Sequence, residues 1–277
     1  MSENMLLPEV DFCAFDLETT GLSNFSRIVE VGAVQFRLEA VHDRFSELVH
    51  PGRSIPEVVI GIHGITDSMV AGAAAAPEVI ERFFEFADGC VLVAHNAAFD
   101  SGIMATELHR AGLEPPEPLI LDTIALARRF LPRLPSYGLG ALSRDLGIGR
   151  PRKHRALEDA EACRRIFERT VLSVPEWQSR PLDLLADTAG GCTLRYRPQA
   201  PSDLPPGMEA ILAALERRGD VVVVYRGGSK GNAPRRLSPV SVYSAGGHCY
   251  MEARCHVDNV TKSFRVDRIA SVELWED

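Results

Sequence analysis

The sequence lacks the features that mark secreted, membrane-spanning and disulfide-bonded proteins. No apolar run approaches the ~18 residues that a membrane-spanning helix requires. The first residues, MSENMLLPEVDF, have no basic stretch and only a short apolar patch, so we expect no secretory signal. The six cysteines form no CxxC pair, which in a chain of 277 residues is typical of reduced thiols. We therefore expect a cytoplasmic protein that does not bind membranes.

The chain also lacks an excess of positive charge. Its net charge is −8; residues 1–180 carry 18 basic and 26 acidic side chains, and residues 181–277 carry 12 of each. This balance argues against non-specific nucleic-acid binding through a basic surface. It leaves open an acidic site that recruits cations before it meets a phosphate. Local basic clusters, read either as phosphate contacts or as solvated surface charge, are Arg150, Arg152, Lys153 and Arg155, and the pair Arg235–Arg236.

The first 175 residues alternate strand-like and helix-like segments, which predicts an α/β fold. We expect three successive strands at 12–18, 27–37 and 44–50, then a helix at 77–87 and a buried strand at 90–95. A helix begins near residue 97, and three more are expected at 122–131, 138–147 and 155–171.

The amino-acid composition changes after residue 175, where Pro, Gly and Asp become frequent. We expect a linker or irregular connection over 176–206. A helix at 208–218 and several short strands with glycine turns follow, which predicts a small β-barrel or sandwich. The expected domains are therefore 1–175 and 207–277.

One aspartate in the expected helix 155–171 lies on the wrong side. At about 100° per residue, Asp159 falls among the apolar positions, near Ile166 and Thr170, while the other charges fill the opposite arc. A carboxylate that points inward must be paired, hydrogen-bonded or bound to a metal, because an unpaired buried charge is very costly.

Three other carboxylates need an explanation of the same kind. The strand period of two places Asp16 and Glu18 on one face of a strand that should be buried, and Asp100 lies in the first turn of the helix that follows strand 90–95. An edge strand with a wet acidic face, and favourable charge at a helix N-terminus, are the structural alternatives. Four hard oxygen donors without a Cys or His pattern favour Mg²⁺ or Mn²⁺.

His154 precedes Asp159 by five residues, so the two cannot point the same way if both are helical. We place His154 in the loop or first turn before the helix, where an imidazole is suited to accept a proton. A surface or capping role is the alternative for a single histidine.

Three motifs, FDLETTG, HNAAFD and HRALEDA, resemble the exonuclease motifs of the DEDDh group in the RNase H-like superfamily, which includes the proofreading subunit of bacterial DNA polymerase III. The resemblance covers residues 10–172 and implies a mixed central sheet flanked by helices. It assigns metal binding to Asp16, Glu18, Asp100 and Asp159, and general base catalysis to His154. The implied contacts to the 3′-terminal nucleotide are Thr19, Thr20, Gly21, Leu22, His63, Asn96 and Phe99.

The same resemblance implies a reaction that uses two divalent ions, Mg²⁺ or Mn²⁺. The expected function is removal of nucleoside 5′-monophosphates from the 3′ ends of single-stranded DNA. An RNA exonuclease is the alternative, because recognition of the 2′-OH depends on contacts that the motifs do not identify. A ligand-sensing regulator, whose nuclease domain docks to a partner, is a third possibility.

The last residues resemble a WYL domain, a small Sm-like or SH3-like β-barrel. The segments RLSP, YMEA and FRVDRI fit the family, whereas the tripeptide that names it falls on Cys249-Tyr250-Met251. The resemblance implies a groove that senses nucleic acid or a nucleotide-like ligand, formed by Tyr225, Arg235, Tyr250, Arg265 and Arg268. Two alternatives remain: Arg265 and Arg268 would face opposite sides of one strand, and Tyr225 suits the rim of a core.

Overall fold

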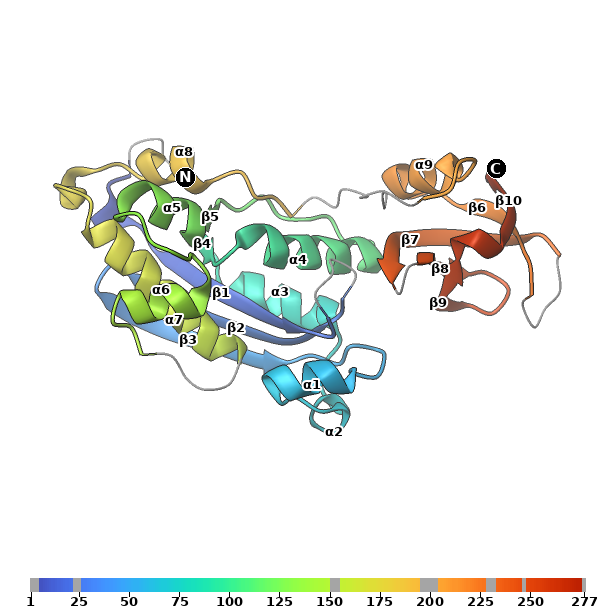
Figure 1. Cartoon of the computed structure of the whole chain (residues 1–277), viewed down its shortest axis with the longest axis horizontal. Coiled ribbons are helices and arrows are strands. Elements are labelled where there is room, and N and C mark those ends of the chain that lie inside the picture. Colours follow the sequence, from blue (N-terminus) through green and yellow to red (C-terminus); the bar gives the residue numbers. More distant parts are fainter. Residues whose placement is uncertain are drawn as a thin grey trace. The chain divides into compact units, whose positions relative to one another are not determined.

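The computed structural model describes residues 5–21, 26–149, 155–194, 204–227, 233–245 and 248–275. The chain divides into two compact units, Met1–Arg195 and Tyr196–Asp277 (Figure 1). Each unit has its own sheet and its own apolar core.

The first unit is built on a five-stranded mixed sheet with the order β3-β2-β1-β4-β5. Its first three strands form an antiparallel meander, and the last two run parallel to β1. The bounds are β1 Phe12–Thr19, β2 Ile28–Arg37, β3 Ala40–Leu48, β4 Val91–Ala94 and β5 Ile120–Asp122. The mixed α/β fold predicted from the sequence is confirmed.

Helices cover both faces of this sheet (Figure 1). One face packs against α3 (Ala76–Phe86) and α4 (Ala97–Ala111), and the other against α5 (Thr123–Phe130), α7 (Ala156–Leu172) and α8 (Asp183–Ala189). The remaining short elements are η1 (Leu7–Glu9), α1 (Glu57–His63), α2 (Asp67–Val70), α6 (Leu139–Asp145) and η2 (Trp177–Ser179). None of the helices in the described residues is long and apolar enough to span a membrane.

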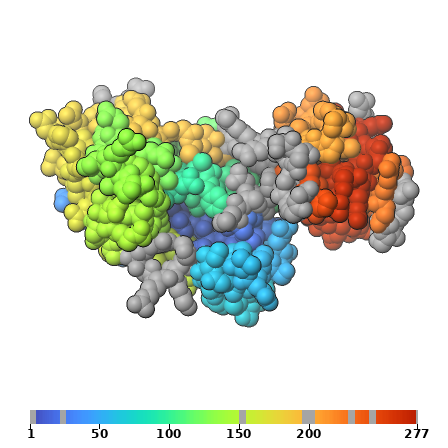
Figure 2. All heavy atoms as spheres, viewed as in Figure 1, coloured from blue at the N-terminus to red at the C-terminus, as the bar shows by residue number. Residues whose placement is uncertain are grey.

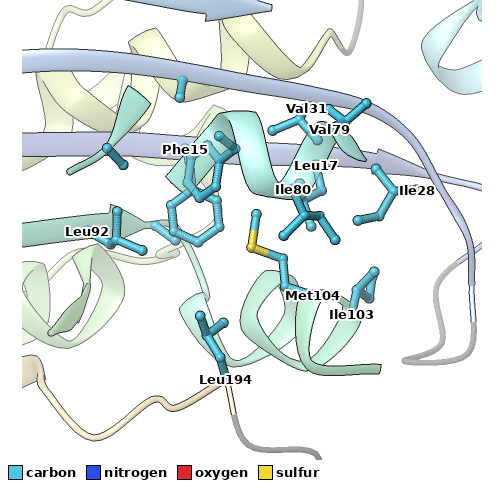
Figure 3. Packing of buried hydrophobic residues seen from close by; sticks show 14 of the residues in the cluster. Phe15, Leu17, Ile28, Val31, Val79, Ile80, Leu92, Ile103, Met104 and Leu194 are labelled. Atoms are coloured by element: carbon cyan, nitrogen blue, oxygen red, sulfur yellow. The ribbon is translucent and has the colours of Figure 1, made fainter. Parts of the chain in front are cut away.

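Alternation along β1 explains how one strand serves two cores. Phe15 and Leu17 belong to the cluster shared with α3 and α4 (Figure 3). The ring centroids of Phe15 and Phe83 of α3 lie 5.4 Å apart. Phe12 faces the other way and packs 4.8 Å from Phe167 of α7. A strand with apolar side chains on both faces is typical of a sheet covered by helices on both sides.

Residues 176–194, the first part of the expected linker 176–206, contain η2 and α8 and pack with the first unit. Leu182 and Leu185, in and before α8, are buried with the α7 core, and Leu194 is buried in the α3–α4 cluster (Figure 3). Residues 176–194 therefore belong to the first unit. The Pro and Gly residues interrupt short helices here, and the leucines between them supply the packing that a linker would lack.

The second unit is a five-stranded antiparallel sheet with the order β10-β6-β7-β8-β9, covered by α9 (Glu209–Arg217). The strands are β6 Val221–Tyr225, β7 Arg235–Ala245, β8 His248–Cys255, β9 Val260–Arg265 and β10 Ile269–Leu274, with η3 (Val266–Arg268) before β10. Ile211 and Leu215 of α9 are buried with Val223, Met251 and Phe264 of the sheet.

The antiparallel sheet agrees with the small β-barrel or sandwich predicted from the sequence, but no closed barrel is found in the described residues. Within the described residues, β10 pairs with β6 and β9 pairs with β8, and no pairing joins these two edges. Residues 260–263 of β9 are exposed and only Phe264 is well buried, so β9 has the polar character of an edge strand.

Candidate active site

One face of β1 changes from apolar to acidic along the strand. Phe12 and Ala14 pack beneath α7, and Asp16 and Glu18 continue the same face towards the end of the strand. Asp16 is half-buried and Glu18 is 9% exposed. The strand period therefore delivers two carboxylates to a largely enclosed position beneath the start of α7.

Helix α7 adds a third carboxylate at this position. Asp159 lies in its first turn and is 4% exposed, as the apolar arc predicted. Ligand oxygens of Asp16, Glu18 and Asp159 all lie within 4.8 Å of one another. We call these three residues the carboxylate cluster.

Asp100, the fourth predicted acid, is tied to the same strand from the other side. It lies in the first turn of α4, and its Oδ1 accepts a hydrogen bond from the backbone N–H of Leu17 at 3.1 Å. Leu17 stands between Asp16 and Glu18, so Asp100 is fixed beside the carboxylate cluster without being one of its three members.

Burial and nearby negative charge raise the pKa of two of these acids, Glu18 and Asp100. Desolvation, followed by the charges of Asp159, Glu30 and Asp100, raises the pKa of Glu18 to about 8. Desolvation also raises the pKa of Asp100 to about 7, against the lowering effect of the hydrogen bond from Leu17. Negative charge thus accumulates here beyond what the surrounding protein neutralises, which is the condition that a bound cation relieves.

The donors of the cluster suit a hard divalent cation. All three are carboxylates, with no thiolate or imidazole among them. Mg²⁺ and Mn²⁺ prefer such oxygen ligands, whereas structural zinc sites are built from Cys and His. On this chemistry, Asp16, Glu18 and Asp159 fit a divalent metal.

Strand β2 supplies two residues that the sequence reasoning missed. Glu30 and Gly32 stand directly opposite Glu18 and Asp16 in the antiparallel pairing. A Cβ atom on Gly32 would lie 2.1 Å from the backbone nitrogen of Leu157, so only glycine allows α7 to lie this close to the sheet. The signal was present in the segment RIVEVGAV, where a glutamate and a glycine interrupt an otherwise apolar strand.

The turn after β1 is closed by its own hydroxyl groups. Thr19 Oγ1 donates to the carbonyl of Gly21 at 2.5 Å, and Thr20 Oγ1 accepts from the backbone N–H of Arg27 at 2.9 Å. Both threonines are buried. These bonds fix residues 19–21 next to Glu18, and the predicted contact Leu22 lies outside the described residues.

Asn96 and Phe99 lie at the start of α4, the helix that carries Asp100. Asn96 is exposed in the left-handed region at φ 63°, and its backbone N–H donates to Asp122 Oδ1 at 3.2 Å. Phe99 is half-buried against the α3–α4 core. Asp122 also caps α5, because its Oδ1 accepts a hydrogen bond from Ile124 N at 2.8 Å. One carboxylate thus links the starts of α4 and α5, a role that the sequence did not predict.

His63 ends α1 and is 1% exposed. Its Nδ1 accepts a hydrogen bond from the backbone N–H of Ile65 at 2.9 Å. Helices α1 and α2, in light blue, lie on the face of the molecule that Figure 2 shows. His63 therefore holds the connection between these two surface helices in place.

The predicted general base, His154, lies outside the described residues, as do Arg150, Arg152 and Lys153. Arg155 is described and is the N-cap residue of α7. In the sequence, His154 comes directly before this N-cap residue of the helix that carries Asp159.

Residues 13–167 match the Exonuclease family, RNase_T, and this match spans more than half of the chain. The chain belongs to this exonuclease family. Its first unit is an exonuclease domain, and all four predicted acids lie within the matched range. Residues 206–274 match the WYL domain family, which makes the second unit a WYL domain.

Relatives of the exonuclease domain occur within much longer proteins. A DNA polymerase III PolC-type of Listeria monocytogenes is 37% identical over 161 residues, which is 58% of this chain and 11% of that protein. A PolC-type polymerase of Caldanaerobacter subterraneus is 38% identical over 169 residues, 61% of this chain and 12% of that protein. The chain thus spans about a tenth of the length of these relatives.

A solved structure of exonuclease X in complex with 5′-overhanging duplex DNA is similar to the exonuclease domain. It is 27% identical, with a TM-score of 0.52, and the match covers 64% of this chain and 98% of that one. The nuclease domain of 3′hExo, a DEDDh family member, shares the fold at 19% identity and a TM-score of 0.53, covering 62% of this chain and 95% of that one.

The WYL domain brings three of its five predicted groove residues together. The hydroxyl of Tyr225 accepts a hydrogen bond from the backbone N–H of Arg265 at 3.1 Å, and Tyr250 is paired with Arg265 across β8 and β9. The Arg265 guanidinium donates to both carboxylate oxygens of Asp267, at 3.1 and 2.5 Å. The charge of Arg265 is therefore paired with that of Asp267.

The other two predicted groove residues are placed differently. Arg235 is 8% exposed at the start of β7, where it pairs with Val223 of β6. The sequence predicted that Arg265 and Arg268 lie on one strand. Instead, Arg265 ends β9 and Arg268 belongs to the 3-10 helix η3. The chain leaves β9 at Arg265 and re-enters the sheet at Ile269, and η3 connects these two edge strands.

Proposed function

We propose that the chain is a metal-dependent 3′→5′ exonuclease that releases nucleoside 5′-monophosphates from single-stranded DNA ends. The observation that carries this proposal is the carboxylate cluster, in which Asp16, Glu18 and Asp159 present oxygens within 4.8 Å of one another. Asp100 is tied to the same strand through Leu17, so the acids of all three motifs lie at one place.

In this proposal, Asp16, Glu18, Asp100 and Asp159 hold the divalent ions. Bound Mg²⁺ or Mn²⁺ would supply the positive charge that the scissile phosphate and the leaving 3′-oxygen require. His154 would accept the proton of the attacking water, a task suited to a side chain that titrates near neutral pH. The low exposure of Glu18 and Asp159 limits competing hydration of these charges.

The turn that follows β1 is proposed to receive the terminal nucleotide. It lies next to Glu18, and its threonine hydroxyls are already engaged within the turn. Contacts from this turn would therefore come from its backbone, and Asn96 and Phe99 at the start of α4 would add further contacts. Such a site reads the end of a strand and its backbone, and not its sequence.

DNA is the proposed substrate because the relatives point that way. The PolC-type relatives are DNA polymerases by name, and exonuclease X was solved with 5′-overhanging duplex DNA. The WYL domain is proposed to bind or sense the strand through Tyr225, Tyr250 and Arg265, with Arg235 and Arg268 nearby in sequence. A soluble, cytoplasmic location is part of the same proposal.

A degradation assay tests the function directly. The full chain is incubated with 5′-labelled single-stranded DNA, with RNA of the same sequence, and with a duplex that has a 5′ overhang, in Mg²⁺, Mn²⁺ or EDTA. We expect a ladder that shortens from the 3′ end of the single-stranded DNA and disappears in EDTA. Asp16→Asn, Asp159→Asn and His154→Ala should abolish the ladder.

Asp43→Asn is the matched control, because Asp43 is an exposed acid on β3 of the same sheet. It should leave the ladder unchanged. Degradation that persists in EDTA or in Asp16→Asn would contradict the proposed function. Faster degradation of RNA than of DNA would keep the chemistry and overturn the proposed substrate.

A further inference from the structure

Glu30 is a buried acid of β2 to which neither the sequence motifs nor the proposed reaction gives a role. It is 1% exposed, yet its carboxylate makes four hydrogen bonds. Arg155 Nε donates to both carboxylate oxygens at 3.1 and 3.0 Å, and Arg155 Nη2 donates to Oε1 at 2.5 Å. The backbone N–H of Ala156 donates to Oε2 at 3.0 Å.

These contacts hold the first turn of α7 against the sheet. Arg155 is the N-cap residue of α7, but its own side chain makes no capping hydrogen bond. Glu30 therefore caps the helix from the neighbouring strand, satisfying a backbone N–H of the first turn that has no partner within the helix. A negative charge at this end is also favoured by the helix dipole.

The same turn carries Asp159. Its backbone N–H donates to the carbonyl of Arg155 at 2.9 Å, so the residue that Glu30 binds is also the residue that anchors Asp159. Glu30 stands directly opposite Glu18 in the strand pairing. One carboxylate thus fixes the separation between the helix and the strand that contribute members of the carboxylate cluster.

The position of Glu30 is costly for folding alone. Glu30 adds a further buried negative charge next to Glu18, and this charge increases the repulsion within the carboxylate cluster. An ion pair on the same sheet shows a more ordinary arrangement: Glu47 of β3 binds Arg82 of α3, with exposed fractions of 32% and 41%. That pair also joins a strand to a helix, but its helix, α3, covers the face of the sheet opposite α7.

We propose that Glu30 and Arg155 form a positioning pair that sets the distance between Asp159 and the two acids of β1, and thereby sets the affinity of the site for divalent ions. The inference rests on the proposed function and concerns the same site. Partners that orient metal ligands typically change metal affinity or activity about 10- to 100-fold when they are replaced.

The test compares Glu30→Gln and Arg155→Lys with Glu47→Gln as the matched control. Glu30→Gln keeps an acceptor for Ala156 but loses the charge, and Arg155→Lys keeps the charge but loses the two-pronged geometry. Mn²⁺ binding is measured by titration calorimetry on the full chain, and kcat and KM are measured on single-stranded DNA. Circular dichroism shows which variants fold.

We expect both positioning variants to weaken Mn²⁺ binding and to lower kcat by about 10-fold or more, with KM nearly unchanged, because the site and not the DNA contact is altered. Glu47→Gln should match the wild type in both measurements. If Glu30→Gln does not fold, Arg155→Lys decides.

Folded positioning variants that bind Mn²⁺ and turn over DNA like Glu47→Gln would overturn the inference. If the wild type binds Mn²⁺ but degrades no substrate, the proposed function fails while the Mn²⁺ affinities still test the positioning pair. A wild type that does not bind Mn²⁺ would overturn both.

Discussion

Asp100 of α4 accepts a hydrogen bond from the backbone N–H of Leu17, the residue between the two acids of β1. The contact links a helix on one side of the sheet to the strand whose opposite face carries Asp16 and Glu18. Asp100 thus has two tasks that can be separated by substitution: it satisfies a buried N–H, and it adds negative charge beside the carboxylate cluster.

Asp100→Asn and Asp100→Ala should therefore have different effects. Asparagine retains an oxygen that accepts from Leu17, so we expect the metal-free protein to be as stable as the wild type or more stable, with activity lost. Alanine leaves the Leu17 N–H unsatisfied, at a cost of about 1–3 kcal/mol. Urea denaturation in EDTA measures both stabilities, and equal destabilisation by the two variants would contradict this division.

Raising the pH should destabilise the metal-free protein. The pKa of Glu18 is raised to about 8 and that of Asp100 to about 7, whereas both titrate near 4 in an unfolded chain. The folded state therefore binds more protons between these values, and the free energy of unfolding falls as pH rises from about 4 through about 8, by up to ~1.4 kcal/mol per pH unit for each carboxyl.

Urea denaturation in EDTA at pH 5 and pH 8 measures this decline. Glu18→Gln should make the loss of stability between pH 5 and pH 8 smaller, because one of the two titrating carboxyls is gone. In a separate measurement without EDTA, Mn²⁺ should restore the stability of the wild type at pH 8. A metal-free wild type that is as stable at pH 8 as at pH 5 would contradict the raised pKa values.

Gly32→Ala should displace the start of α7 from the sheet. The new Cβ would lie 2.1 Å from Leu157 N and 2.2 Å from the carbonyl carbon of Ala156, and both are backbone atoms that cannot move independently. We expect destabilisation of about 1–3 kcal/mol, as for other overpacked sites, together with weaker Mn²⁺ binding. Thermal denaturation and titration calorimetry measure the two effects.

Gly61→Ala is the matched control for this substitution. A Cβ on Gly61, within α1, would meet nothing within 4 Å. Alanine is favoured over glycine in a helix by about 0.5–1 kcal/mol, so this variant should be slightly more stable than the wild type. If Gly32→Ala behaved like Gly61→Ala, the close approach of α7 would not depend on glycine.

The WYL domain offers a test in which one substitution strengthens binding. Arg265 donates to Asp267, whose pKa is lowered by this hydrogen bond and by the positive charge of the arginine. Asp267→Asn should release the guanidinium and tighten binding of a labelled single-stranded oligonucleotide, whereas Arg265→Gln should weaken it.

Fluorescence anisotropy in EDTA measures this binding without degradation of the oligonucleotide. The effect of Asp267→Asn should shrink at high salt, because contacts to phosphates depend on counterion release. Unchanged affinity in both variants would remove Arg265 from the proposed groove.

Local periodicity was sufficient for the acids of β1 and α7. A period of two placed Asp16 and Glu18 on one face, and the helical period placed Asp159 among apolar residues, which the buried position of Asp159 bears out. Both patterns are properties of a single element, so they can be seen without knowledge of its neighbours.

Features that depend on two elements were missed. Glu30 looked like one charge in an apolar strand, and its partner Arg155 lies 125 residues away in the sequence. The three-residue strand β5 is too short to show a period, and the second sheet is open because β9 and β10 do not pair with each other in the described residues. Such features are set by tertiary contacts and not by local propensity.

The burial of Leu194 in the α3–α4 cluster sets where the exonuclease domain can be cut. A chain shortened after residue 175 would remove this leucine from one core and Leu182 and Leu185 from the other. If this shortened chain lost activity, the cause would be a damaged exonuclease fold and not the absence of the WYL domain. A chain that ends at Arg195 keeps all three leucines. Comparison of this chain with the full chain therefore isolates what the WYL domain contributes.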